Sequence, residues 1–209
     1  MTRTRGPGAT HETRRAEVVD AVLTVAAARG VPAVSQAGVA AAAGISPGRV
    51  QHYFPTMTDL LGAALDRLNA ASSARIREAV GGDVDAAPSR RVLEVVLTEL
   101  IPHDDPSRAH LQFRQSFTAL ALHHEDIAAR LRRQYHQLHQ RDLAGLIERE
   151  QQAGLIPSGV APASAATGLA ALAEGLAYYV LIDAVTAADA RDQVLDAVAG
   201  LYRSTTGRR

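Results

Sequence analysis

Residues 35–54 read Ser-Gln-Ala-Gly-Val-Ala-Ala-Ala-Ala-Gly-Ile-Ser-Pro-Gly-Arg-Val-Gln-His-Tyr-Phe, and the spacing within this stretch decides how the first part of the chain folds. Ala40 precedes Gly44 by four residues and Val50 by ten. In a helix-turn-helix, a small residue lies where the two helices touch, a glycine supplies a positive φ in the turn, and a branched apolar side chain packs the second helix onto the first. The stretch therefore predicts a helix-turn-helix. A generic helical hairpin is the competing interpretation, because alanine is common throughout the chain.

Serine residues are expected to begin both helices of this motif. Ser35 precedes the first helix, which Gly44 ends. Ser46 followed by Pro47 then restarts the chain as a helix, since a hydroxyl N-cap and a proline at the first helical position both favour initiation. The start of the second helix would present unpaired backbone N–H groups, which suit a phosphate or the rim of the major groove of DNA.

The second helix also carries side chains that suit base reading. Arg49 lies in its first turn and can form two parallel hydrogen bonds with guanine, while Gln51 and His52 can bond to base edges or to the DNA backbone. Gly48 permits close approach of the main chain, and Tyr53 can give its hydroxyl to a phosphate. Taken alone, an arginine is more often a solvated surface residue, so the prediction of a DNA-reading face rests on the position of Arg49 in the motif.

The rest of the chain has helical periodicity and no long alternation of polar and apolar residues, so the predicted fold class is all-α. A first helix is expected over residues 13–29, a fourth from a cap at Thr58 to Gly81-Gly82, and later ones from Pro88, Pro106, Glu125, Pro162 and Ala188. The predicted domains are a flexible basic arm (1–12), a helix-turn-helix DNA-binding domain (13–57) and a larger helical effector-binding and dimerisation domain (58–209).

The composition excludes several classes of protein. The chain has 209 residues, 47% of them hydrophobic, and its 22 basic residues, all arginine, balance 22 acidic ones. The absence of cysteine removes disulfides, thiolate zinc sites and thiol nucleophiles, and it makes the reducing cytoplasm the expected compartment. No apolar segment follows the basic start and acidic residues interrupt the longest apolar stretches, so we expect neither a signal peptide nor a membrane span.

Histidines raise the alternative of a metal-dependent enzyme. His136 and His139 have the i, i+3 spacing of a metal pair, but a solvated histidine face is the simpler interpretation. The chain has no P-loop, no Gly-x-Ser-x-Gly and no His-Glu-x-x-His. We therefore expect no enzymatic activity, no cofactor and no metal. A metal-dependent helical enzyme and a helical protein-interaction module remain the alternatives to DNA binding.

The segment from Gly30 to Leu61 resembles the TetR family of bacterial transcriptional repressors. The likeness centres on Gly44-Ile45-Ser46-Pro47-Gly48-Arg49-Val50-Gln51-His52-Tyr53-Phe54 and continues through Thr58-Asp59-Leu60-Leu61, and its Ser-Pro-Gly and His-Tyr-Phe are closest to the choline-responsive BetI-like branch. The resemblance implies a homodimer whose recognition helices enter the major groove of a near-palindromic operator in double-stranded DNA. It also implies that an unidentified small molecule, bound in the C-terminal domain, moves the fourth helix and releases the operator.

The family's usual DNA-contact positions fall on Gln36, Ser46, Pro47, Gly48, Arg49, Gln51, His52, Tyr53 and Thr56. The chain departs from the family pattern at Gln51, where a tyrosine is common, at Pro47, where a basic residue is common, and at Met57, where a lysine is common. These departures remove phosphate contacts. Either Arg14, Arg15 or the N-terminal arm supplies the missing charge, or the affinity for DNA is modest.

Two further expectations concern the C-terminal part. An apolar ligand pocket needs aromatic walls, and its candidates, each of which could instead be plain core, are Phe113, Phe117, Leu120, Tyr135, Leu138, Tyr178 and Tyr179. Helices over 162–183 and 188–202 are expected to form a four-helix dimer seam, because small side chains permit close helix approach. The small residues on which this expectation rests are Ala165, Ala166, Gly168, Ala170 and Ala173.

Overall fold

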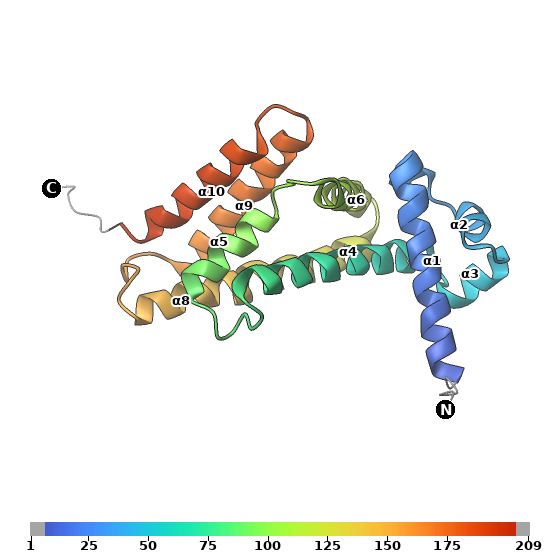
Figure 1. Ribbon diagram of the computed structural model, residues 1–209, viewed down its shortest axis with the longest axis horizontal. Coiled ribbons are helices and arrows are strands. Elements are labelled where there is room, and N and C mark those ends of the chain that lie inside the picture. Colours follow the sequence, from blue (N-terminus) through green and yellow to red (C-terminus); the bar gives the residue numbers. More distant parts are fainter. Residues whose placement is uncertain (1–6, 204–209) are drawn as a thin grey trace. The chain divides into compact units, whose positions relative to one another are not determined.

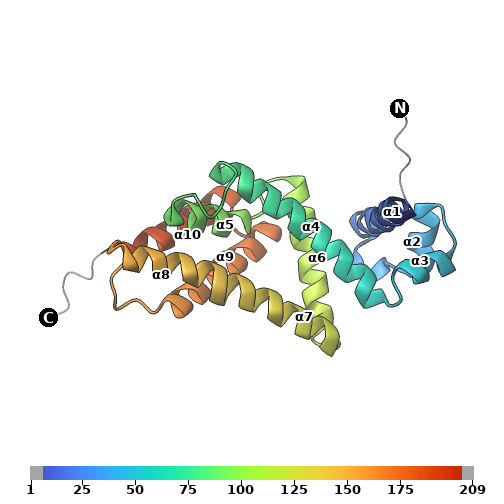
Figure 2. The same ribbon diagram turned by 90° about the horizontal axis from the view of Figure 1, so that it is seen from below.

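The structure, a computed structural model, describes residues 7–203, and every regular element in that range is helical (Figures 1 and 2). The all-α fold class is therefore confirmed. In chain order the elements are α1 (Pro7–Arg29), the 3-10 turn η1 (Val31–Ala33), α2 (Gln36–Ala43), α3 (Pro47–Tyr53), α4 (Met57–Val80), α5 (Ser89–Glu99), α6 (Asp105–Ala121), α7 (Glu125–Tyr135), the π-helical segment η2 (His136–Leu143), α8 (Ala144–Gln152), α9 (Pro162–Leu181) and α10 (Ala187–Leu201).

The chain divides into two compact units. Among the described residues, the head unit comprises 7–70 and 112–128, and the body unit comprises 71–111 and 129–203. The division falls inside α4. The reason is that the first turns of α4 carry the buried side chains Leu60, Leu61 and Leu65, which tie this half of the helix to the head.

Helix α1 begins at Pro7, six residues before the expected start at Thr13, so the second half of the predicted flexible arm is helical. A proline at the first position of a helix costs no hydrogen bond, because the N–H there has no helical partner. Val18, Val22 and Val25 are buried and anchor α1 in the head. The residues of the predicted arm before Pro7 lie outside the described residues.

A single helix runs from Glu125 to Gln152 through α7, η2 and α8 (Figure 2), close to the predicted end at Gly154. Its middle, His136–Leu143, is π-helical, which the 3.6-residue periodicity did not predict. A π-helical segment changes the angle between successive side chains, so the buried positions that follow it do not continue the stripe that precedes it.

The core of the body unit lies between α5, α8, α9 and α10, and Leu93, Leu97 and Ile147 are among its fully buried side chains. Helix α9 is long and apolar enough to cross a membrane by length and composition alone. Its buried residues, Leu169 and Leu176 among them, pack into this core, which is the arrangement of a core helix.

The small residues of α9 require a correction to the predicted dimer seam. Ala166, Ala170 and Ala173 are fully buried in the core of their own unit, and Ala165 is partly buried against it. Their size lets α9 approach its own neighbours closely, so these alanines are not available to a partner. Of the residues on which the seam prediction rested, Gly168 alone lies on the exposed side of α9.

Candidate DNA-binding surface

The turn between α2 and α3 has the geometry that the sequence spacing predicts. Gly44 has φ 66° and ψ 31°, in the left-handed region that glycine adopts without steric penalty. The Ile45 N–H donates to the carbonyl of Ala40 at 3.0 Å, and the Gly44 N–H donates to that of Ala41 at 3.4 Å. These bonds satisfy carbonyls at the end of α2 and fix the direction in which α3 begins.

Val50 and Phe54 hold α3 against the rest of the head. Their side chains are 0% and 1% exposed, and Ala40, the small residue of the motif, is 1% exposed. The predicted inward roles of these residues are confirmed. The pattern fixes which side of α3 faces the protein and therefore which side faces outward.

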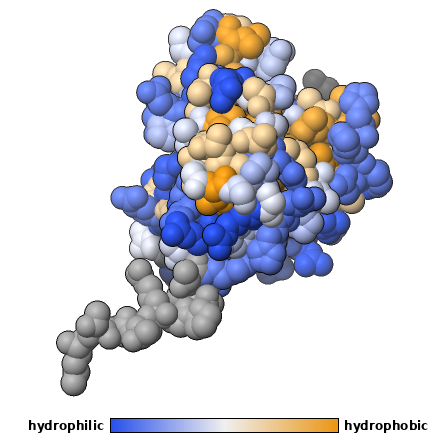
Figure 3. Space-filling model, turned by 90° about the vertical axis from the view of Figure 1, so that its right-hand side faces the viewer, coloured by the Kyte–Doolittle hydropathy of each residue, from blue (hydrophilic) through white to orange (hydrophobic). Residues whose placement is uncertain are grey.

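The outward side of α3 carries Gly48, Arg49, Gln51 and His52, all of them exposed. Figure 3 views the molecule from the side to which α2 and α3 belong, and hydrophilic residues cover most of it, with smaller apolar patches between them. A Cβ added at Gly48 would meet no heavy atom of the described residues within 4 Å, so the main chain is open to a partner there. A guanidinium, an amide and an imidazole therefore lie on one short helix, and together they can donate to and accept from base edges.

Ser46 is the N-cap residue of α3 and Pro47 begins this helix, as predicted, but the Ser46 hydroxyl makes no capping hydrogen bond. In α2 the equivalent bond is present, because the Ser35 Oγ accepts the N–H of Gly38 at 3.1 Å. Ser46 is exposed and its hydroxyl has no hydrogen-bond partner among the described residues, so it can both donate to and accept from another molecule.

Helix α4 is capped by Thr56, and the predicted cap at Thr58 is wrong. The Thr56 hydroxyl accepts the N–H of Asp59 at 3.0 Å and donates to Asp59 Oδ2 at 2.7 Å, while the Thr56 N–H donates to the same oxygen at 3.2 Å. This reciprocal arrangement is a capping box with aspartate at its third helical position, and Thr58 already lies inside the first turn. Because the one hydroxyl proton of Thr56 goes to Asp59, none is left for a phosphate.

Helix α1 brings a residue to this surface that sequence reasoning missed. The ring of His11 lies 4.9 Å from that of Tyr53 and 6.3 Å from that of His52, centroid to centroid. Four residues on, the Arg15 guanidinium lies 4.6 Å from the centre of the Phe54 ring, in cation–π contact. The i, i+4 spacing of His11 and Arg15 was the available signal, and assigning residue 11 to a flexible arm concealed it.

The two arginines expected to replace the missing phosphate contacts have different surroundings. Arg14 Nη1 donates to Glu17 Oε2 at 2.6 Å, and this hydrogen bond raises the pKa of Arg14. The Arg15 Cζ lies over the Phe54 ring, and the Arg15 guanidinium has no hydrogen-bond partner among the described residues. Its N–H groups are therefore available to an acceptor such as phosphate, so Arg15 is the better placed of the two.

The residues predicted to line an effector pocket are divided between the two units: Phe113, Phe117 and Leu120 belong to the head unit, and Tyr135, Leu138, Tyr178 and Tyr179 belong to the body unit. Phe113 and Phe117 are buried. Leu138 is partly buried against the body core. Tyr178 and Tyr179 are 47% and 50% exposed on α9, so about half of each side chain faces away from the core.

The two histidines of the predicted metal pair, His136 and His139, have different surroundings on the long helix. His136 is exposed, whereas the His139 ring lies 5.2 Å from the Tyr135 ring and its Nε2 atom is buried with no hydrogen-bond partner among the described residues. Within residues 7–203, no three His, Cys, Asp or Glu side chains are grouped as metal ligands would be. The pair therefore does not share one metal-facing side of the helix.

Two family models match the chain. The one described as "Bacterial regulatory proteins, tetR family" matches residues 18–64, which include α2 and α3. The one described as "BetI-type transcriptional repressor, C-terminal" matches residues 88–203 and alone spans more than half of the chain. The two matches do not overlap, and residues 65–87 lie between them, so the N-terminal and C-terminal parts are each similar to a different family model.

Individual transcriptional regulators are similar to this chain over most of its length. The HTH-type transcriptional regulator PksA of Bacillus subtilis is 28% identical over 178 residues, which cover 84% of this chain and 82% of that protein. A solved structure from Rhodococcus sp., described as a TetR-family transcriptional regulator, is 28% identical with a TM-score of 0.79 and covers 92% of this chain and 100% of its own. A transcriptional regulator from Saccharomonospora viridis, solved in complex with choline, has a TM-score of 0.77 at 20% identity, with 90% and 96% covered. At that identity the likeness shows the fold alone.

Proposed function

The chain belongs to the TetR family of bacterial transcriptional regulators, with a DNA-binding and a ligand-binding domain, and we propose that it is a repressor that releases its operator when a small molecule binds the C-terminal domain. Members of this family are not enzymes, which removes the metal-dependent alternative. The observation that carries the proposal is the two-sided character of α3, buried through Val50 and Phe54 and exposed through Arg49 and its neighbours. We expect the protein to act in the cytoplasm, where its operator lies.

Base reading is assigned to the exposed side of α3. Arg49 forms two hydrogen bonds with a guanine, and Gln51 and His52 bond to neighbouring base edges. Gly48 and Pro47 lie against the DNA backbone, where the absence of a side chain at Gly48 allows close contact. This arrangement gives sequence selectivity to α3 and leaves affinity to the phosphate contacts around it.

Phosphate contacts are assigned to the residues that flank α3. Gln36 at the start of α2, the uncapped Ser46 hydroxyl and the Tyr53 hydroxyl each have a proton to donate. Arg15 adds the positive charge that the family pattern places elsewhere. Thr56, whose hydroxyl serves the cap of α4, contributes by fixing where α4 begins.

The experiment that tests this assignment is an electrophoretic mobility shift with the intergenic DNA beside the protein's own coding region. We expect tight binding that weakens with salt and that an excess of unrelated DNA does not abolish. Weak binding that unrelated DNA competes away equally would contradict the repressor proposal and favour the protein-interaction module.

Dimerisation through the exposed side of α9 is the second part of the proposal. Gly168, Ala171 and Gly175 follow one another at helical spacing, and a Cβ at either glycine would meet no described heavy atom within 4 Å. The stripe continues into the half-exposed Tyr178 and into Ile182, which is 54% exposed. Small residues beside large apolar ones let a second α9 pack closely, and two heads spaced about 34–36 Å apart then match a near-palindromic operator.

Analytical ultracentrifugation tests this interface. Ala171→Arg places a charge in the exposed stripe of α9 without touching the core, and we expect it to shift the protein to monomer. Ala109→Arg, at an exposed position of α6 outside both helices of the predicted seam, is the control and should leave the dimer intact. An unchanged mass for Ala171→Arg would place the interface elsewhere.

The effector is proposed to be a small molecule held by the C-terminal domain. The family model that matches residues 88–203 is of BetI type, and a structural neighbour binds choline, so choline is the first compound to test. Of the predicted lining residues, Tyr135 and Leu138 are the partly buried members in the body unit and are the first to mutate. Mass spectrometry of ligand that co-purifies with the protein, followed by operator release with that ligand, identifies the effector without assuming its class.

A further inference from the structure

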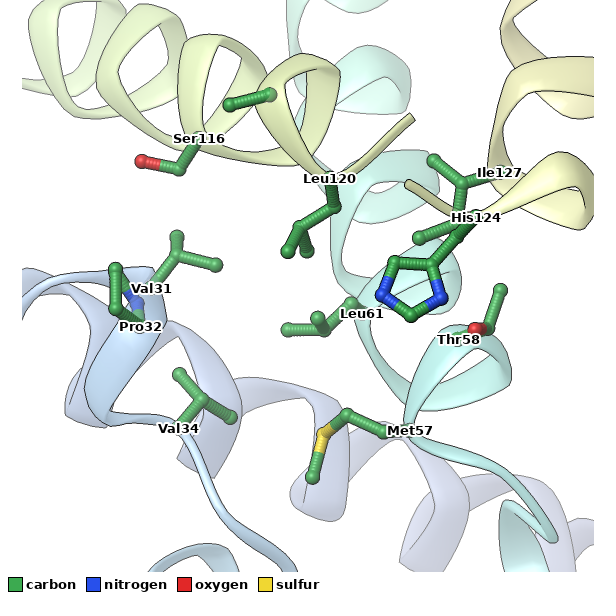
Figure 4. A pocket seen from close by; sticks show the side chains of 11 residues that line it. Val31, Pro32, Val34, Met57, Thr58, Leu61, Ser116, Leu120, His124 and Ile127 are labelled. Carbon is green, nitrogen blue, oxygen red and sulfur yellow. The ribbon is translucent and has the colours of Figure 1, made fainter. Parts of the chain in front are cut away.

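The head unit contains a cavity of about 390 Å³ that the DNA-reading surface does not use. Four elements line it: η1, the first turns of α4, the end of α6 and the start of α7 (Figure 4). The lining residues Pro32, Ala119 and His124 are exposed, so the cavity is open to solvent on one side. Val31, Val34, Leu61 and Ile127 form its buried part. In Figure 4 the side chains of Leu61, from α4, and Leu120, from α6, point into the same space. All of these residues belong to the head unit.

The lining defines the chemistry of a ligand. It contains no Asp, Glu or Arg side chain, so it offers no ion-pair partner to a charged molecule. Its polar groups are the hydroxyls of Thr58 and Ser116 and the imidazole of His124, and none of these side chains has a hydrogen-bond partner among the described residues. Met57 adds a thioether, which makes favourable contacts with aromatic rings.

We propose that this cavity is a binding site for a small uncharged aromatic alcohol, separate from the effector site of the C-terminal domain, and that its occupancy changes operator affinity. The volume lies within the range of about 300–1,000 Å³ that is usual for small-molecule sites. The aliphatic side chains cover the faces of a flat ring, and the ligand hydroxyl bonds to the free hydroxyls or to His124. The effect on operator affinity rests on the proposed repressor function, whereas binding itself does not.

The location of the cavity explains how a bound ligand can affect the DNA-binding surface. Val34 directly precedes Ser35, the N-cap of α2, and Met57 directly follows Thr56, the cap of α4. The walls are therefore the two chain segments through which the helix-turn-helix is attached. A ligand that separates or tightens these segments alters the position of α2 and α3, and the two binding events become coupled.

The test of binding uses the intact chain and the fluorescence of 2-naphthol, without DNA. Ala119→Leu adds three carbons to an exposed lining residue of α6, while Ala109→Leu adds the same carbons to another exposed residue of α6, outside the lining. We expect saturable binding to the wild type and to Ala109→Leu, and binding about tenfold weaker or lost in Ala119→Leu, because the added side chain occupies the ligand volume. Equal affinities for all three proteins would overturn the site.

A second variant and a second readout sharpen the test. Ser116→Ala removes one hydroxyl from the lining without adding volume, so it should weaken 2-naphthol more than naphthalene, and equal losses would contradict the assigned hydrogen bond. Mobility shifts with and without saturating 2-naphthol then test coupling, and an unchanged operator affinity would overturn the regulatory part. Operator binding without any probe tests the repressor proposal separately, so the failure of one is distinguishable from the failure of the other.

Discussion

Helices α2 and α3 are joined by a single glycine turn and both begin after a serine, yet only one of these serines serves its own helix. The Ser35 Oγ accepts the Gly38 N–H at 3.1 Å, whereas the Ser46 hydroxyl makes no capping bond. Both helices bury one side, through Val39 and Ala40 in α2 and through Val50 in α3. The difference indicates that the serine at the start of α2 stabilises its own helix, whereas the serine at the start of α3 is available to a binding partner.

The largest effect is expected from breaking the turn that holds the two helices in this relation. Gly44→Val forces a β-branched residue into φ 66°, and we expect a loss of about 2 kcal/mol in the free energy of unfolding together with the loss of operator binding. Thermal denaturation and mobility shifts measure both effects. Gly48→Ala is the matched control, because its Cβ meets no described atom within 4 Å, so it should fold at least as stably as the wild type. If Gly44→Val kept the stability and operator affinity of the wild type, the turn would not be what positions α3.

The next effect separates recognition from stability. Arg49→Ala removes an exposed side chain from α3, so the free energy of unfolding should stay the same within about 0.5 kcal/mol. Discrimination between the operator and a variant of its guanine should fall by about 1–3 kcal/mol. Competition binding with the two duplexes measures this difference. Uniform weakening on every sequence would instead assign Arg49 to a phosphate.

The helix-turn-helix could be predicted from the sequence because its constraints are local. A positive φ at Gly44 and burial of Ala40 and Val50 follow from spacing within a few turns. The cap of α4 was misplaced because Thr56 and Thr58 are both followed by helix-forming residues, and the choice depends on the reach of Asp59 back to the Thr56 N–H. The capping-box spacing was the available signal, because an acidic residue, Asp59, stands three positions after Thr56, whereas Leu61 stands three positions after Thr58.

The C-terminal part could be predicted as helices but not as sites. An alanine such as Ala166 or Ala170 can face either its own core or a partner, and only the packing of α5, α8 and α10 against α9 shows that both face inward. The cavity of the head unit could not be predicted either, because η1 and α6 meet there from distant parts of the sequence. Periodicity gives each helix a buried side but does not specify what lies against it.

A smaller effect tests the two serines directly. Ser35→Ala removes a capping bond from α2 and should lower the free energy of unfolding by about 1 kcal/mol. Ser46→Ala removes no such bond, so it should leave stability nearly unchanged and should instead weaken operator binding through a lost phosphate contact. Chemical denaturation and mobility shifts on both variants give the comparison. If both serines affected stability equally, the distinction between α2 and α3 would fail.

The smallest effect concerns the charge that α1 supplies beside α3. Glu17 accepts a hydrogen bond from Arg14 at 2.6 Å, so it competes with phosphate for that guanidinium, whereas Arg15 lies over the Phe54 ring and has no such competitor among its described contacts. Glu17→Gln removes the negative charge, and because the pair is exposed we expect no measurable change in thermal stability. Operator affinity at low salt should rise slightly with a steeper salt dependence, as Arg14 becomes available to the DNA backbone. The control is the double variant that combines Glu17→Gln with Arg14→Gln. It should show no gain in operator affinity, because no guanidinium remains at position 14. An affinity that Glu17→Gln leaves unchanged at every salt concentration would show that Arg14 does not reach the DNA and that Arg15 alone replaces the missing charge.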